Sequence, residues 1–269
     1  METVVREIRS KQALARCRLP GIDYSINPYV GCEHCCSYCY ATFMKKFTSQ
    51  TGEWGEFVDV KINLHQVIRY ELKTTKPGAV FLSSVCDPYQ PAEAKYEITR
   101  KSLDEFAKSE NGKKFEISIL TKSNLCLRDI DIFQKLGCSV GFSFSSIDNK
   151  FEVNSSRFRQ KINALKMLNN NNIKTYAFLG PILPLITDSD IDKMFEEFSG
   201  LGLNHILVDK LNIRSGNWAV IETVLKRHYP EHLDEFRKIV FGRTGYWNEI
   251  RARISGLAKI HNIKVIFCF

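Results

Sequence analysis

The sequence has no hydrophobic run that approaches the roughly 20 residues needed to cross a bilayer. Its first ten residues, Met1 to Ser10, also lack the apolar core of a secretory signal. Hydrophobic residues make up 44% of the chain and charged residues 25%, as in ordinary globular proteins. We therefore expect a cytoplasmic protein with no membrane partner.

A low-complexity linker and a run of like charges are also missing, so nothing marks a domain boundary. The length of 269 residues lies within the range that α/β barrels reach as one unit. We expect a single domain over residues 1–269, with a core at about 20–210 and a C-terminal extension at about 211–269.

The cysteine pattern argues against a disulfide framework, because the nine cysteines are an odd number and most are scattered. This usage is typical of a reducing compartment. Four of the cysteines are expected to be ordinary thiols: Cys17, Cys126, Cys138 and Cys268. The formal charge of +8 would attract polyanions, but a basic average alone is a weak sign of nucleic-acid binding.

Three cysteines do lie close together, at Cys32, Cys36 and Cys39, inside the segment from Asn27 to Ala41. Three thiolates can hold three irons of a four-iron cluster and leave the fourth iron open to an exogenous ligand. The spacing therefore predicts a metal centre with one reactive position.

A zinc site is the alternative interpretation, since His34 and Cys35 could supply a fourth ligand. Zinc ribbons and fingers usually bring a second ligand pair about 12 to 20 residues later. The next cysteine here is Cys86. We therefore favour the cluster and interpret Cys35 as a neighbour that is not a ligand.

The cysteine loop resembles that of radical S-adenosylmethionine (SAM) enzymes, in which the amino and carboxylate groups of SAM chelate the open iron. Tyr38, the aromatic residue before the last cysteine, is part of the resemblance. The resemblance implies a [4Fe-4S] cluster and SAM as cofactors. It also implies that Tyr38 lies at the SAM site.

Short β-branched or aromatic runs alternate with amphipathic stretches, which is typical of strand-helix units and a parallel sheet. Strands are expected at residues 24–27, 79–83, 115–120, 139–144, 174–179 and 204–208, with a late strand at 264–267 and a further edge strand at 57–62. Expected helices include one that starts near Asp188–Ile191 and a last long one over Tyr246–His261. Six such units predict an α/β fold, a partial (β/α)6 TIM-type barrel that resembles the radical SAM core, with a C-terminal helical extension.

The carboxyl ends of barrel strands are where chemistry collects. After the second strand, Ser83, Ser84 and Asp87 could accept hydrogen bonds from the SAM ammonium. The alternative is a turn built by Asp87 and Pro88, which the serines cap. Lys122, after the third strand, could pair with the SAM carboxylate, or it is a surface lysine.

The fourth strand ends with Ser143 and Ser145, which are two residues apart and so point to the same side. We expect both at the cofactor site, with Phe142 and Phe144 facing the helices. The stretch Leu179–Pro184, after the fifth strand, either contacts adenosine or closes the barrel.

The strings Asp87–Glu93, Thr121–Ser123 and Pro181–Pro184, together with the cysteine loop, look like the radical SAM branch related to spore photoproduct lyase. That lyase repairs a thymine photoproduct in DNA, and a cysteine returns a hydrogen atom. The resemblance implies that Cys86 is a hydrogen donor and that Tyr38 helps to relay the radical. Cys86 is followed at once by Asp87, which departs from the lyase spacing, and a plain strand-end thiol is the alternative.

The function that the resemblance implies is reductive cleavage of SAM to a 5′-deoxyadenosyl radical, which takes a hydrogen atom from an unidentified substrate. An external electron donor of the flavodoxin or ferredoxin type is implied as a partner. The alternatives are a DNA photoproduct lyase-like repair enzyme and a non-catalytic zinc or iron-sulfur protein.

The C-terminal third mixes basic and aromatic residues, which suits either a nucleic-acid surface or a set of solvated helix faces. The residues are Arg214, Lys226, Arg227, Arg237, Lys238, Arg243, Arg251 and Arg253, with Trp218, Tyr229, Tyr246 and Trp247 among them.

Overall fold

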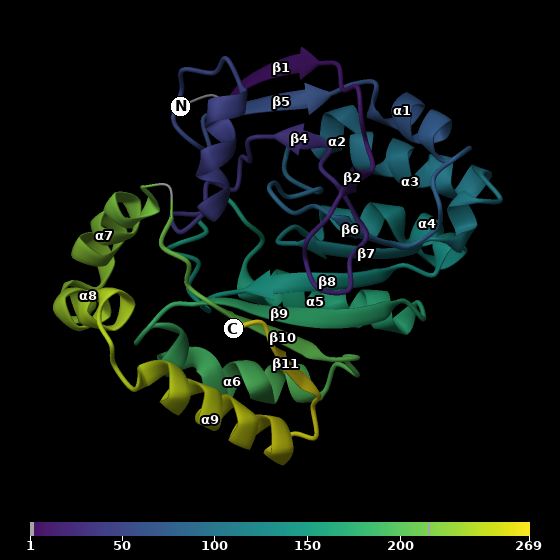
Figure 1. Cartoon of the computed structure of the whole chain (residues 1–269). Helices are drawn as coiled ribbons and strands as arrows, with labels where there is room; N and C mark the ends of the chain where they lie inside the picture. The colour runs from purple at the N-terminus through teal and green to yellow at the C-terminus, as the bar shows by residue number, and fades with distance from the viewer. Residues whose placement is uncertain (1–2, 215) are drawn as a thin grey trace.

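An eight-stranded sheet organises the computed structural model, which describes residues 3–214 and 216–269. Its order is β11-β10-β9-β8-β7-β6-β3-β2; the pairs from β11 to β3 are parallel, and β2 is antiparallel to β3. The strands are β2 (Ala15–Arg16), β3 (Tyr24–Ile26), β6 (Ala79–Leu82), β7 (Glu116–Thr121), β8 (Ser139–Phe144), β9 (Lys174–Ile182), β10 (Ile206–Lys210) and β11 (Val265–Phe267). The expected α/β fold with six parallel strand-helix units is confirmed, and the strands form an open arc in Figure 1.

Helices connect the strands and cover the outer face of the arc (Figure 1). The α-helices are α1 (Leu64–Glu71), α2 (Glu93–Tyr96), α3 (Ile98–Lys108), α4 (Ile130–Leu136), α5 (Phe158–Asn170), α6 (Thr187–Ser199), α7 (Asn217–His228), α8 (Leu233–Phe241) and α9 (Tyr246–Ile260). The 3-10 helices are η1 (Tyr40–Phe47), η2 (Gly112–Lys114), η3 (Asn124–Asp129) and η4 (Pro230–His232). The helices expected near Asp188 and over Tyr246–His261 are thus confirmed within one residue.

Alternation along β8 shows how the sequence sets the two faces of the sheet. Phe144 is fully buried and packs against Phe158 of α5 and Phe198 of α6, with ring centroids 5.5 and 5.0 Å apart. Ser143 and Ser145 point to the opposite side, because side chains alternate along a strand. The expectation that the phenylalanines face the helices is confirmed.

The strand expected at residues 57–62 forms as β5 (Phe57–Lys61), but it is not an edge of the main sheet. It is the central strand of a second sheet, parallel to β1 (Val4–Ile8) and antiparallel to β4 (Tyr29–Val30). Burial explains the correction: Phe57, Val58 and Val60 are fully buried, which a central strand allows.

The strand expected at residues 174–179 continues through Gly180 and Pro181 to Ile182. The expected loop at Leu179–Pro184 is therefore mostly strand. The sheet tolerates the proline because β10 shifts register between Val208 and Lys210 beside it.

The C-terminal extension contributes a second apolar cluster. Leu211, Ile221, Leu225 and Phe236 pack with residues that come before them, including Tyr38 of the cysteine loop. No helix of the described residues is long and apolar enough to cross a membrane. The single-domain expectation stays a prediction.

Candidate active site

The three cysteines lie on one loop, residues 31–39, between β4 and η1. Two tight turns shape it: the Cys35 N–H donates to the Cys32 carbonyl at 3.2 Å, and the Cys39 N–H donates to the Cys36 carbonyl at 3.0 Å. Cys32 is buried, and Cys36 and Cys39 are half-buried. Burial, then Asp87 and the other two cysteines, raise the pKa of Cys32 well above its usual range, so the loop brings the three thiols within electrostatic reach of one another.

Two residues with positive φ, Gly31 and Cys35, determine the backbone conformation of the loop. Gly31 has φ +90°, and a Cβ there would lie 2.2 Å from the carbonyl oxygen of Phe57, so only glycine fits. Cys35 has φ 48°, and its thiol lies 3.5 Å from the Trp54 carbonyl. That contact directs Cys35 toward the segment before β5, which agrees with its interpretation as a non-ligand.

The donor set suits an iron-sulfur cluster. Burial raises the pKa of Cys36 and Cys39, while the Lys122 ammonium lowers both, as a nearby cation does for a thiolate. Thiolates are the ligands of such clusters. Within residues 3–214 and 216–269, no three His, Cys, Asp or Glu side chains are grouped as they would be around one metal ion. The ligand roles of the three cysteines stay a prediction.

Hydrogen bonds fasten the loop to the segment after β6. The Glu33 N–H donates to Gln90 Oε1 at 2.9 Å, and the Ala92 N–H donates to Glu33 Oε2 at 2.6 Å. Gln90 Nε2 donates to the Gly31 carbonyl at 3.3 Å. These bonds connect parts of the chain nearly 60 residues apart, and so hold the cysteines at the carboxyl ends of the strands.

Asp87 is buried, and protein groups surround both of its oxygens. Oδ1 accepts from the Tyr89 N–H at 2.9 Å and from the Thr121 hydroxyl at 2.7 Å; Oδ2 accepts from the Lys122 N–H at 2.7 Å and lies 3.3 Å from His34 Nε2. Burial would raise the pKa of Asp87, but His34 and the hydrogen-bond donors outweigh it and lower the pKa to about 2. These contacts favour a role in joining the cysteine loop to the end of β7 over direct contact with the SAM ammonium.

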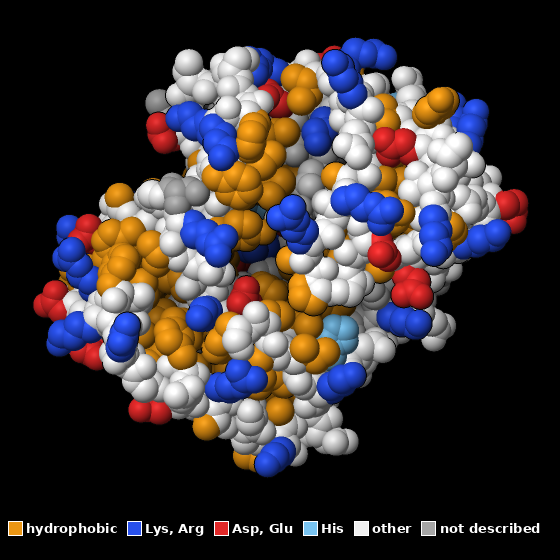
Figure 2. Space-filling view, in the orientation of Figure 1, with side chains coloured by type: hydrophobic (Ala, Val, Ile, Leu, Met, Phe, Trp, Pro, Cys, Tyr) orange, Lys and Arg blue, Asp and Glu red, His pale blue; other side chains and the backbone are white. Residues whose placement is uncertain are grey.

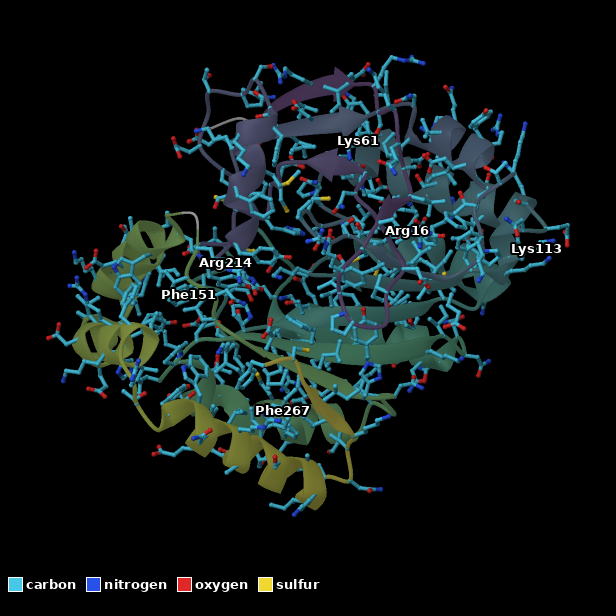
Figure 3. All side chains as sticks on the ribbon, in the orientation of Figure 1. Arg16, Lys61, Lys113, Phe151, Arg214 and Phe267 are labelled. Atoms are coloured by element: carbon cyan, nitrogen blue, oxygen red, sulfur yellow. The ribbon has the colours of Figure 1, made fainter. Side chains whose placement is uncertain are left out.

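Ser83, Ser84 and Cys86 lie together after β6. The Ser83 hydroxyl is buried beside the Cys86 thiol, but it has no partner in hydrogen-bond geometry among the described residues, so it is available to a ligand. Ser84 instead accepts from Asn27 Nδ2 at 3.1 Å. Burial raises the pKa of Cys86 to about 11, against the opposing effects of Ser83 and of Lys61 at the end of β5 (Figure 3).

Lys122 and Ser143 meet at the ends of β7 and β8. Lys122 Nζ donates to the Ser143 hydroxyl at 3.0 Å and lies 5.8 Å from the centre of the Tyr38 ring. The Ser143 hydroxyl donates to the Gly180 carbonyl at 3.0 Å. Burial lowers the pKa of Lys122, but Glu152, Cys36 and Asp87 outweigh it and raise the pKa, so the ammonium stays charged. Lys122 is therefore not a surface lysine.

A buried carboxylate, Glu152, joins several of these side chains. It accepts from the Tyr38 hydroxyl, from the Ser145 hydroxyl at 2.8 Å and from Lys161 Nζ at 2.7 Å. Lys161 Nζ also donates to the Ser143 carbonyl at 3.0 Å, and both Lys161 and Glu152 are only 2% exposed. The Ser145 hydroxyl therefore already has a protein partner in Glu152, and a direct contact between Ser145 and SAM stays a prediction.

Tyr38 is buried, and its surroundings bear on the expected relay. Its hydroxyl bonds Glu152, and its carbonyl accepts from Asn217 Nδ2 of α7 at 3.0 Å. In the part of the chain that the structure describes, no hydrogen bond joins Tyr38 to Cys86. A relay between the two residues stays a prediction.

Glu152, Lys161 and Asn217 were not expected at the site. A sequence signal existed for Lys161, because it lies three residues after Phe158 and one before Ile162, on the apolar stripe of α5. A lysine on such a stripe is buried with a partner. Glu152 follows a polar turn and Asn217 begins a distant helix, so neither had a comparable signal.

The aromatic residues of the basic C-terminal third have internal partners. Ring or hydroxyl contacts join Trp218 to Phe241, Tyr229 to Phe151 (labelled in Figure 3), Tyr246 to Asp188 and Trp247 to Phe269. On the face in Figure 2, the Lys and Arg side chains are spread among acidic and neutral ones. These contacts favour solvated helix faces over a base-stacking surface.

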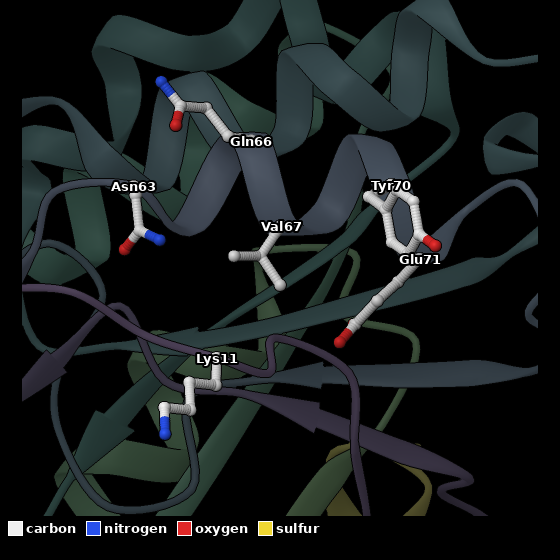
Figure 4. A pocket seen from close by; sticks show the side chains of 6 residues that line it. All are labelled: Lys11, Asn63, Gln66, Val67, Tyr70 and Glu71. Atoms are coloured by element: carbon white, nitrogen blue, oxygen red, sulfur yellow. The ribbon is translucent and has the colours of Figure 1, made fainter.

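A cavity of about 370 Å³ lies away from these residues, between α1 and the N-terminal segment (Figure 4). Its polar side chains fasten that segment: Asn63 accepts from the Ser10 N–H at 2.7 Å, and Glu71 accepts from the Leu14 N–H at 2.8 Å. None of the expected site residues lines it. The cavity is therefore separate from the cysteine loop and the strand ends around it.

The fold and the cysteine loop are those of a radical SAM protein, and sequence comparison agrees. The chain belongs to the Radical SAM superfamily, whose sequence model matches residues 26–198. It is accordingly a radical SAM enzyme, and membership implies a [4Fe-4S] cluster and SAM as cofactors. Among particular relatives, the uncharacterized protein MJ0683 of Methanocaldococcus jannaschii is 33% identical over 94% of this chain and 93% of its own length. A radical SAM Nalpha-GlyT isomerase of Pseudomonas phage M6 is 26% identical over 78% of this chain and 44% of its own.

Solved structures show the same fold. A spore photoproduct lyase mutant with bound AdoMet and dinucleoside spore photoproduct superposes with a TM-score of 0.65 at 17% identity, over 85% of this chain and 66% of the lyase chain. Streptococcus suis SuiB bound to S-adenosylmethionine superposes with a TM-score of 0.56 at 10% identity, over 90% of this chain and 49% of its own. The expected resemblance to the lyase is confirmed at the level of fold.

Proposed function

We propose that the chain holds a [4Fe-4S] cluster through Cys32, Cys36 and Cys39 and binds SAM beside it, at the carboxyl ends of β6, β7 and β8. When bound, the reduced cluster supplies the electron that cleaves SAM to a 5′-deoxyadenosyl radical, which abstracts hydrogen from the substrate. An external donor of the flavodoxin or ferredoxin type supplies that electron. The observation that carries the proposal is that three cysteines lie on one loop held by two turns, with the Lys122 ammonium close enough to lower the pKa of Cys36 and Cys39.

The chain's own residues bind and orient in this proposal. Lys122 stays charged and supports the thiolates, and it can pair with the SAM carboxylate. The unpaired Ser83 hydroxyl accepts from the SAM ammonium. Asp87 holds the cysteine loop in place through His34 and the Lys122 N–H, so it positions the cluster and SAM without touching them. Glu152 holds Lys161 in place.

The test is cluster-dependent cleavage of SAM. The protein is reconstituted anaerobically with iron and sulfide and reduced, and 5′-deoxyadenosine is quantified. Wild type should be brown and form 5′-deoxyadenosine, whereas Cys36→Ala should fall to background. Cys268→Ala, which removes an exposed thiol outside the loop, is the matched control and should match wild type. Retained cleavage in Cys36→Ala, or a colourless protein with tightly held zinc, contradicts the proposal.

A photoproduct lyase-like reaction is the second candidate, and Cys86 is the observation that favours it. A hydrogen-atom donor must carry its S–H, and a pKa of about 11 keeps the Cys86 thiol protonated at neutral pH. Ultraviolet-irradiated DNA is the probe. Wild type should restore thymine, and Cys86→Ala should keep 5′-deoxyadenosine formation but lose restored thymine. No restored thymine with wild type rules this candidate out and leaves SAM cleavage standing.

A further inference from the structure

The 3-10 helix η1 carries three aromatic side chains that face solvent. Tyr40, Phe43 and Phe47 are 46%, 36% and 69% exposed. Tyr40 and Phe43 lie three residues apart, which is one turn of a 3-10 helix. Lys46 Nζ lies over the Phe43 and Phe47 rings, 6.0 and 4.9 Å from their centres, and so joins them into one surface. Single exposed apolar side chains are ordinary, but a contiguous group of them is typical of an interaction site.

The charge on this surface is positive. Among the residues of η1 none is acidic, and Lys45 and Lys46 lie in its last turn. Lys45 Nζ lies 3.3 Å from Glu53 Oε1 and is partly neutralised, whereas Lys46 contacts the rings. Figure 2 shows hydrophobic side chains gathered in the region of η1, with Lys and Arg side chains beside them. An apolar centre with a basic rim suits a protein partner with an acidic surface. We call this group the η1 face: Tyr40, Phe43, Lys45, Lys46 and Phe47.

The η1 face begins directly after Cys39, a predicted cluster ligand. A 3-10 helix rises about 2.0 Å per residue, so Phe43 lies about 8 Å along the helix from Cys39. The Tyr40 hydroxyl donates to the Ser84 carbonyl after β6, which fixes the start of η1 to the strand ends. A partner seated on the η1 face is therefore held close to the cysteine loop.

We propose that the η1 face docks an acidic electron-transfer protein of the flavodoxin or ferredoxin class. The inference rests on the proposed function, because it assigns the docking surface of the external donor. One electron leaves the reduced donor, which is oxidised, and enters the cluster, which is reduced; no atom is transferred. Encounters between electron-transfer proteins use small interfaces, which a short helix can supply. Lys46 covers one side of the Phe43 and Phe47 rings, which favours a protein over bases stacked on those rings.

The double variant Lys46→Glu/Phe47→Ala tests the inference in the reconstituted enzyme. Formation of 5′-deoxyadenosine from SAM is measured with three reductants: dithionite, a bacterial flavodoxin and a bacterial ferredoxin, each protein kept reduced by its NADPH-dependent reductase. The variant should need a roughly tenfold higher concentration of donor protein for the half-maximal rate, with the wild-type rate in dithionite. The matched control is Lys238→Glu/Phe241→Ala, which changes an exposed lysine and an exposed phenylalanine of α8 and should match wild type with every reductant.

A second variant, Lys46→Glu alone, changes only an exposed side chain and so leaves the fold intact. Wild type should lose donor-supported rate as salt rises from about 50 to 200 mM, and Lys46→Glu should lose less, because salt screens the attraction that the variant lacks.

The outcomes separate this inference from the proposed function. If wild type forms no 5′-deoxyadenosine with dithionite, the proposed function itself fails. If dithionite supports cleavage but neither donor protein does, or if both variants keep the wild-type dependence on donor and salt, the docking inference is overturned. Fluorescence anisotropy with labelled single-stranded DNA covers the other partner class: weaker DNA binding by the double variant with unchanged donor kinetics assigns the η1 face to nucleic acid and also overturns the inference.

Discussion

Replacing Lys161 with methionine tests whether the buried network holds the site together. Methionine keeps the aliphatic bulk of the side chain, so the change removes a charge without opening a large cavity. The Lys161 ammonium has two partners, the Glu152 carboxylate at 2.7 Å and the Ser143 carbonyl at 3.0 Å. Lys161→Met leaves the buried Glu152 carboxylate without its ammonium.

The size of the stability loss in Lys161→Met follows from the burial of the Lys161–Glu152 ion pair. Breaking a buried ion pair typically destabilises by about 3–5 kcal/mol, because one charge stays buried without its partner. Glu152 keeps donors from Tyr38 and Ser145, so we expect the lower end, about 3 kcal/mol. For a chain of this size that is a fall in Tm of roughly 6–9 °C.

The stability difference between Lys161→Met and wild type also depends on pH. Burial raises the pKa of Glu152, but Lys161 and Lys122 outweigh it and lower the pKa from 4.5 to about 2. A lowered pKa gives stability that is complete above pH 4.5 and is lost as the pH falls through about 2. Without Lys161 the pKa rises, so the difference between variant and wild type should narrow as the pH falls from 7 toward 2.

Chemical unfolding of the apoprotein, followed by circular dichroism under reducing conditions, measures the difference. The matched control is Lys226→Met, which removes an exposed lysine paired with Glu222 four residues earlier and should cost less than about 0.5 kcal/mol. If Lys161→Met lowers the free energy of unfolding by less than about 1 kcal/mol at pH 7, or by an amount that does not change with pH, then Lys161 does not stabilise the buried Glu152 charge.

Two further predictions concern the loop. Gly31→Ala places a Cβ against the Phe57 carbonyl at a residue with positive φ. It should destabilise the fold by about 1–3 kcal/mol and lower the iron content after reconstitution. Gly256→Ala, where the Cβ meets open space, is the control and should have neither effect. Equal iron content in the two variants would contradict this account. Cys35→Ala should keep the wild-type iron content and visible spectrum, because its thiol contacts the Trp54 carbonyl, and loss of one iron per cluster would show instead that it is a ligand.

Much of the fold could be predicted because the signals were local. The run Ser139–Phe144 is a strand with the expected bounds, since its alternation needs no information from distant residues. The placement of Phe57–Lys61 could not be predicted in the same way, because its partners in β1 and β4 are two short strands set by tertiary contacts. Local pattern indicates a strand but not the sheet it joins.

The site residues could likewise be predicted where they depend on local pattern, and not where they depend on contacts between distant residues. Asp87 and Lys122 were expected near the cysteines because strand ends of a parallel sheet lie at one edge, and the Asp87 carboxylate does accept from the Lys122 N–H. The sequence could not show that Asp87 would be surrounded by internal donors. It also gave no sign of Glu152, whose buried charge is stabilised by Lys161 and Lys122, which are close to it in space but not in sequence.

The hydrogen bond from Asn217 to the Tyr38 carbonyl has a consequence for biosynthesis. The cysteine loop is translated before the segments after β6 and β8 that hold it in place, and before α7, whose Asn217 follows Tyr38 by 179 residues. A nascent chain that has not reached α7 therefore has all three cysteines but lacks the last of these fastenings. Iron delivered to the ribosome-bound chain would meet a looser loop than iron delivered after release.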